Sequence, residues 1–141
     1  PAAARWQQDL ELLHADLAIM HKNRTEHQKA TITEVVGSVE GHTCIIYDDM
    51  IDSAGSIVSA ADALKKRGAK EIYAAATHPI FSGPAIERLK SVGFKEIVVT
   101  DSIFVEGKPL KNLTILPIAP LLATVLTQIE RKKSVTSIYK K

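Results

Sequence analysis

The sequence predicts an α/β domain with a mostly parallel, twisted sheet that is flanked by helices on both faces. Short apolar runs rich in β-branched residues alternate with segments whose apolar residues recur every three or four positions. The predicted strands are apolar throughout, which is typical of parallel strands that are covered on both sides. Ligands of such sheets bind beyond the carboxyl ends of the strands, so the residues that follow each strand are the candidates for function.

The first part of the chain is predicted to hold one helix and three strands. Apolar residues at spacings of four and three predict a helix over residues 2–14. We expect a short buried strand over 16–21, a polar segment over 22–29 and an edge strand over 31–39. Residues 43–47 are rich in β-branched side chains and bounded by turn signals, which predicts the next strand.

The second part alternates strands and helices more regularly. Ile57, Ala60, Ala61 and Leu64 form one apolar stripe, which predicts a helix over 56–66 that Gly68 ends. The further predicted elements are a strand at 71–77, a helix at 84–89, strands at 94–100 and 113–118, and a closing helix at 120–131. There is no internal repeat or linker, so we expect one domain over residues 1–141.

Composition narrows the class of protein. The formal charge is only +2 and the Lys and Arg residues are dispersed, so we expect no nucleic-acid partner. No apolar run approaches 20 residues and no signal peptide is visible, so we expect no membrane span. The single cysteine, Cys44, suits a reducing cytoplasm and is expected to be a structural residue in a strand. Because the chain begins with Pro1, we expect a processed or truncated piece.

The strongest functional signal is the stretch that follows the predicted strand at 43–47. Asp48 and Asp49 come first, then Asp52, and then the small residues Ser53-Ala54-Gly55-Ser56 ahead of a helix. A loop of this kind can wrap closely around a phosphate, which the helix N-terminus favours electrostatically. The carboxylates suit sugar hydroxyls or a divalent metal. A sugar-phosphate site is therefore expected, and a simple helix cap is the alternative.

The acids are not expected to act alike. Neighbouring strand residues point to opposite faces, so Asp48 and Asp49 reach one ligand only if the strand has ended before them. Repulsion from a phosphate dianion argues against Asp52 as a phosphate ligand and favours a role at C1, as a base or beside a metal. The polar segment 22–29 is either a surface loop or a basic flap over an anionic ligand, and its composition favours the loop.

Several motifs occur together in the chain. Residues 46–56 read Ile-Tyr-Asp-Asp-Met-Ile-Asp-Ser-Ala-Gly-Ser, residues 76–85 read Ala-Thr-His-Pro-Ile-Phe-Ser-Gly-Pro-Ala, and residues 99–103 read Val-Thr-Asp-Ser-Ile. With the His-Lys-Asn-Arg of segment 16–24, they resemble the ribose-phosphate pyrophosphokinase family, in the order found there. The resemblance runs from about residue 15 to residue 139 and implies the type I phosphoribosyltransferase fold.

The resemblance implies an enzyme that transfers the β,γ-diphosphate of ATP to the 1-hydroxyl of ribose 5-phosphate, with Mg²⁺. Lys22 would be the catalytic lysine that stabilises charge on the transferring group, which is what such transfers chiefly need. The residues implied to bind ribose 5-phosphate are Arg24, Asp48, Asp49, Asp52, Ser53, Ala54, Gly55 and Ser56. No metal ligand is assigned in this chain, because its histidines lack metal-ligand spacing.

The chain also departs from the family pattern. Family members are about twice as long, and their first half carries most of the ATP site, so this chain resembles a carboxyl-terminal half that is inactive alone. Serines stand where threonines are usual in the loop at 53–56. The tail with Ser134, Thr136 and Tyr139 resembles a regulatory phosphate or ADP site between subunits, which implies a homo-oligomer. Simple packing of the tail is an equal alternative.

Two other functions remain open at this point. A phosphoribosyltransferase that consumes phosphoribosyl pyrophosphate would share the fold, but it usually has a hood for a nucleobase, and no such segment is evident. A non-catalytic, synthetase-like regulatory subunit would keep the fold without turnover. The presence of Lys22, Arg24 and the complete acid loop argues against this reading.

Overall fold

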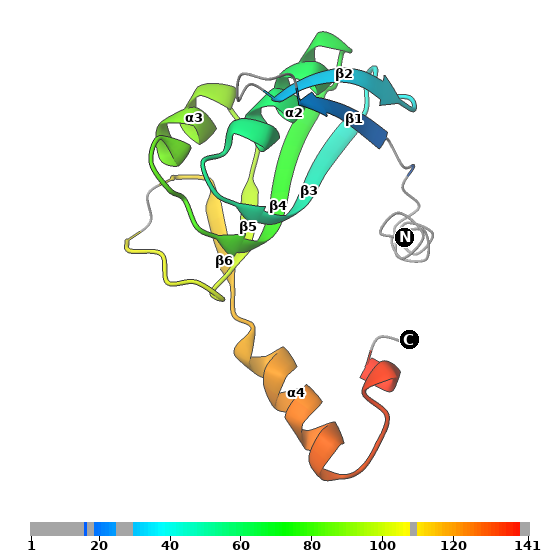
Figure 1. The fold of residues 1–141 in the computed structure, drawn as a ribbon, viewed down its shortest axis with the longest axis vertical. Coiled ribbons are helices and arrows are strands. Elements are labelled where there is room, and N and C mark those ends of the chain that lie inside the picture. The colour runs from blue at the N-terminus through cyan, green and yellow to red at the C-terminus, as the bar shows by residue number, and fades with distance from the viewer. Residues whose placement is uncertain (1–15, 17–18, 25–29, 108–109, 139–141) are drawn as a thin grey trace.

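The computed structural model describes residues 16, 19–24, 30–107 and 110–138. Its main sheet has four strands that lie side by side in chain order, and all three neighbouring pairs are parallel. The strands are β3 (Thr43–Ile51), β4 (Glu71–Pro79), β5 (Ile97–Thr100) and β6 (Leu113–Leu116) (Figure 1). The predicted α/β class with a mostly parallel sheet is confirmed.

Helices α2 (Gly55–Lys66) and α3 (Ala85–Val92) pack on one face of this sheet. The predicted stripe of α2 is buried, because residues three or four apart share one helix face. The basic residues of its last turn complement the negative end of the helix dipole. The core between helices and sheet is made of aliphatic side chains and Phe94. The aliphatic members include Ile46, Ile57, Ala61, Leu64, Ala74, Leu89, Ile97 and Leu113.

The opposite face of the sheet is open in the described part of the chain. Ile45 is 67% exposed and Tyr47 is 50% exposed. The helix predicted at 2–14 lies outside the described residues, so helical cover on this second face stays a prediction. Helix α4 (Ala119–Glu130) projects from the sheet in Figure 1, and none of its residues is buried. A 3₁₀ turn (Val135–Ile138) follows it.

Strands β1 (Ile19–Arg24) and β2 (Ala30–Val36) form a separate antiparallel sheet, and β2 lies beside α2. The prediction that a polar loop begins at Lys22 is wrong, because β1 continues to Arg24 and pairs with β2 over its whole length. The reason is that backbone pairing satisfies the N–H and C=O groups of a polar strand as well as those of an apolar one. Residues 25–29 lie outside the described residues.

No helix in the described ranges is long and apolar enough to cross a membrane.

Candidate functional site

Asp48 and Asp49 lie within β3, so the expectation that the strand ends before them is wrong. The ladder with β4 continues past both acids and ends with Ile51 opposite Pro79. The cause is the length of the partner strand, which the apolar pattern of β3 does not reveal. Asp48 is half-buried and Asp49 is exposed, and the Asp49 amide donates to the Asp48 Oδ1 over 2.9 Å. As neighbours in a strand, the two carboxylates leave the backbone on opposite sides.

The small-residue loop lies between the end of β3 and the start of α2, in the predicted order. Ala54 has a left-handed conformation, with φ 60° and ψ 6°, and its side chain is 5% exposed. Helix α2 then starts at Gly55, with no side chain capping it and no acidic residue in its first turn. Ser53 and Ser56 are half-buried beside it. The positive end of the helix dipole therefore faces a loop of small residues, as an anion site requires.

The segment between β4 and α3 contacts this loop directly. The Phe81 and Ser82 amides donate to the carbonyl oxygens of Ile51 and Asp52, and the Ser82 hydroxyl also donates to the Asp52 carboxylate. Arg88 of α3 donates from Nη1 to the Ser53 carbonyl over 2.9 Å. Sequence reasoning did not single out Arg88. Its only signal is a position one turn into a helix that starts at the ligand-binding edge of the sheet.

The ends of β4 and β5 are joined by side-chain hydrogen bonds. Thr100 Oγ1 and Ser102 Oγ both donate to the Thr77 carbonyl, over 2.6 Å and 2.9 Å. His78 Nδ1 lies 2.9 Å from the same Ser102 oxygen. Because the Ser102 proton is already directed to Thr77, the His78 ring donates from Nδ1. His78 is thus a hydrogen-bonded residue of this network.

The basic and tail candidates are placed only in part. Lys22 and Arg24 lie on β1, and the backbone is what the structure describes there. The approach of their side chains to the acid loop stays a prediction. Ser134 and Thr136 are exposed at the 3₁₀ turn, where the Ser137 hydroxyl donates to the Ser134 carbonyl. Tyr139 lies outside the described residues.

Cys44 is half-buried in β3, and its Sγ lies 3.8 Å from the His42 carbonyl. Burial raises the pKa of the Cys44 thiol, because desolvation disfavours the thiolate. This arrangement agrees with the expected structural role.

Iodoacetamide is expected to alkylate Cys44 several-fold more slowly than free cysteine at pH 8. A raised pKa lowers the thiolate fraction at any pH below it, and the thiolate is the nucleophile. Mass spectrometry of timed samples measures the rate. The rate in guanidinium chloride should approach that of free cysteine, and equal rates in the folded and unfolded chain would contradict the buried assignment.

Metal ligands are sparse in this part of the chain. Among the described residues, no group of three or more His, Cys, Asp or Glu side chains could hold a metal ion. The paired carboxylates of β3 nevertheless offer the hard oxygen ligands that Mg²⁺ prefers. Such ions are often held by one or two carboxylates together with substrate phosphates.

Comparison with known proteins gives a consistent result. The phosphoribosyl synthetase-associated domain matches residues 7–140. The chain is 45% identical over 128 residues to a ribose-phosphate pyrophosphokinase of Bacillus caldolyticus, covering 90% of this chain and 41% of that protein. A Bacillus subtilis protein of the same name is 43% identical over 128 residues, covering 90% and 40%.

A solved structure is also similar. The crystal structure of phosphoribosylpyrophosphate synthetase from Mycobacterium smegmatis superposes with a TM-score of 0.77 at 39% identity, over 93% of this chain and 41% of that one. The chain thus spans about two fifths of the length of the curated relatives it matches. None of these names favours the phosphoribosyltransferase or regulatory-subunit alternatives.

Proposed function

This chain belongs to the phosphoribosyl synthetase-associated domain family, and from that membership we propose that it supplies the ribose 5-phosphate site of a ribose-phosphate diphosphokinase. The observation that carries the proposal is the loop at 52–56. It combines a left-handed Ala54, two hydroxyl side chains and an uncapped helix start directly after paired acids. The names of the relatives supply the reaction class.

The proposed reaction transfers a diphosphoryl group. The 1-hydroxyl oxygen of ribose 5-phosphate forms a bond to the β-phosphorus of ATP, the bond from that phosphorus to the bridging oxygen of AMP breaks, and the hydroxyl loses its proton. Residues 53–56 would bind the 5-phosphate, while Asp48 would accept hydrogen bonds from the sugar. Asp49 leaves β3 on the opposite side and is not assigned to the same ligand. Lys22 and Arg24 would stabilise the negative charge that spreads during transfer.

Mg²⁺ and ATP are part of this proposal. A single carboxylate of this stretch, either that of Asp52 or one from the end of β3, would hold the cation together with substrate oxygens. When bound, the ion would neutralise charge on the phosphates. This chain's own part is to bind and orient the sugar phosphate beside it.

The proposal extends to the organisation of the protein. We propose that residues 1–141 form a single domain, which is the carboxyl-terminal half of a two-domain enzyme. The supporting facts are the match over residues 7–140 and the coverage of about two fifths of each relative. The resemblance of the tail supports a homo-oligomer, and the single cysteine supports a cytoplasmic protein.

Calorimetric titration with ribose 5-phosphate tests the site. The chain should bind this ligand, and the Asp52→Asn/Ser56→Ala double variant should bind it about tenfold more weakly or worse, because at least one hydrogen bond to a charged group is lost. Asp62→Asn, an exposed change on the same helix, is the matched control and should leave affinity unchanged. Equal binding by the double variant would refute the site.

Formation of phosphoribosyl pyrophosphate from ATP by the chain alone would refute the two-half organisation.

A further inference from the structure

The backbone carbonyl oxygens from the last residue of β3 through the loop before α2 all accept hydrogen bonds, three from the segment 81–88 and one from α2 itself. Four consecutive residues, 51–54, have a carbonyl oxygen that accepts a hydrogen bond. The bonds are Phe81 N to Ile51 O at 2.9 Å, Ser82 N to Asp52 O at 3.1 Å, Arg88 Nη1 to Ser53 O at 2.9 Å and Val58 N to Ala54 O at 3.1 Å. Three of the four donors come from the single segment 81–88.

This pattern matters because a carbonyl oxygen that faces a phosphate repels it. A loop binds an anion only when its N–H groups face the ligand and its carbonyl groups point elsewhere. The donors to Ile51 and Asp52 are the backbone amides of Phe81 and Ser82, so these two bonds depend on the backbone conformation and not on a side chain. The left-handed conformation at Ala54 turns the backbone between the held carbonyls and the helix start. The bond to Ser53 is the one in this set that depends on a side chain.

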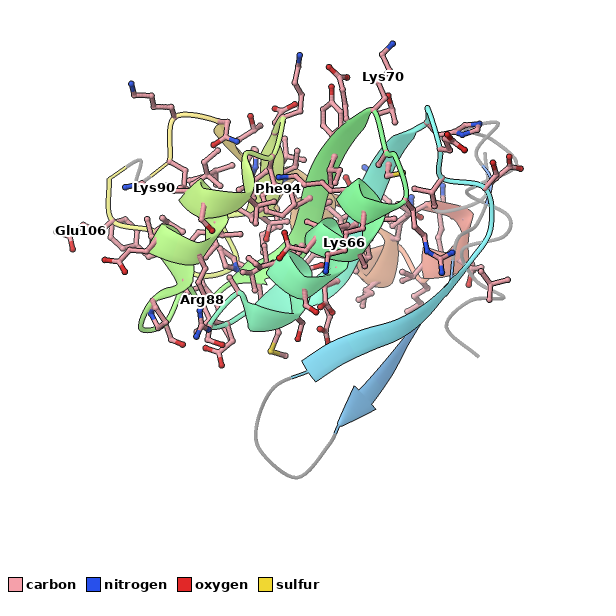
Figure 2. All side chains as sticks on the ribbon, turned by 90° about the horizontal axis from the view of Figure 1, so that it is seen from above. Lys66, Lys70, Arg88, Lys90, Phe94 and Glu106 are labelled. Carbon is pink, nitrogen blue, oxygen red and sulfur yellow. The ribbon has the colours of Figure 1, made fainter. Side chains whose placement is uncertain are left out.

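Arg88 also brings charge to the loop. Its Nη1 lies 3.6 Å from the position that a Cβ on Gly55 would occupy, so the guanidinium lies against the first residue of α2. Figure 2 shows Arg88 extending from α3, whereas Lys90 of the same helix is labelled at a different part of the surface. No acidic residue in the first turn of α2 offsets this cation. Arg88 therefore combines a hydrogen bond to the loop backbone with a positive charge beside it.

We propose that Arg88 is a positioning residue for the phosphate of ribose 5-phosphate. It holds the Ser53 carbonyl away from the anion. Its guanidinium charge, which lies beside Gly55, also attracts the phosphate. This inference rests on the proposed function, because it assigns a residue to the same phosphate loop. A residue that merely anchored α3 to the sheet would affect folding without affecting the phosphate.

The test compares three changes at Arg88 with one at Lys90. Arg88→Leu removes the bond and the charge, Arg88→Gln keeps a donor without charge, and Arg88→Lys keeps the charge with a different donor geometry. Calorimetry should show affinity for ribose 5-phosphate about tenfold or more weaker in Arg88→Leu, with partial recovery in Arg88→Lys. Lys90→Leu removes the same charge from the same helix and should change affinity less than about twofold. The salt dependence of binding should fall in Arg88→Gln and not in Arg88→Lys.

A ligand-free measurement separates this inference from the function itself. The amide resonances of Ser53, Ala54 and Gly55 should shift in Arg88→Leu and Arg88→Gln and stay in place in Lys90→Leu. Unshifted resonances would overturn the inference, as would unchanged ribose 5-phosphate affinity in a folded Arg88→Leu or Arg88→Gln chain. If the unaltered chain fails to bind ribose 5-phosphate, the proposed function fails, and the resonances still decide whether Arg88 orders the loop. Lower stability with unchanged affinity would identify Arg88 as an anchor of α3 only.

Discussion

Leu89→Ala is expected to lower the free energy of unfolding by about 3 kcal/mol, within the range typical of a buried leucine. Leu89 is 2% exposed on the inner face of α3 and belongs to the core under that helix. Helix α3 has eight residues and buries only Ala85, Leu89 and Val92, so Leu89 contributes much of its apolar contact with the sheet. The change removes buried carbons and leaves a cavity that surrounding side chains fill only in part.

Urea denaturation followed by circular dichroism measures this effect, provided that the dependence on urea is the same in both chains. Leu121→Ala is the control, because Leu121 is 44% exposed on α4 and its loss should cost less than about 0.5 kcal/mol. Similar losses from the two changes would contradict the placement of α3 on the sheet.

Ala54→Val is expected to destabilise the chain by about 2–3 kcal/mol and to abolish detectable binding of ribose 5-phosphate. A β-branched residue is a genuine outlier in the left-handed conformation that Ala54 adopts. The Ala54 side chain is also 5% exposed, so the two added methyl groups have no free space. Relief of either problem requires a change of the loop backbone, and that backbone is the proposed phosphate site.

Ala54→Gly is the informative counterpart. Glycine adopts positive φ without strain, which offsets the entropy that it adds to the unfolded chain, so stability should stay within about 1 kcal/mol of the original. Ala123→Val, on an exposed face of α4, controls for the cost of valine in a helix and should cost less than about 0.7 kcal/mol. Thermal unfolding and calorimetry provide the two measurements. A tolerated Ala54→Val chain with intact affinity would contradict the left-handed conformation at this position.

Features that depend on neighbouring residues could be predicted from the sequence. The order of strand, small-residue loop and helix around Ala54 is one example, because small residues and a periodic apolar stripe are local signals. The stripe of α2 is another, since its buried residues are the ones that its spacing indicates. The parallel sheet followed from strands that are apolar throughout.

Features that depend on distant residues could not be predicted in this way. Strand β3 extends to Ile51 because β4 continues beside it. The residues of β3 do not by themselves indicate how long β4 is. Strand β1 extends to Arg24 because β2 pairs with it there. The contact of Arg88 with Ser53 joins two segments that are separated by α2 and β4, and a single arginine in a helix does not specify its acceptor. In each case, the determining partner lies elsewhere in the chain.

The separation of the two sheets also has a kinetic consequence. The hairpin of β1 and β2 pairs residues that are close in sequence, such as Arg24 with Ala30, whereas the main sheet pairs Thr43 with Glu71 across an entire helix. Closing a long loop costs chain entropy before any contact forms, so local pairs assemble early and distant parallel pairs assemble late. Among the described residues, the two sheets share no ladder. The strand that carries Lys22 is therefore expected to pair with β2 independently of the main sheet. Its pairing is expected to be faster than the step that brings the four parallel strands into register.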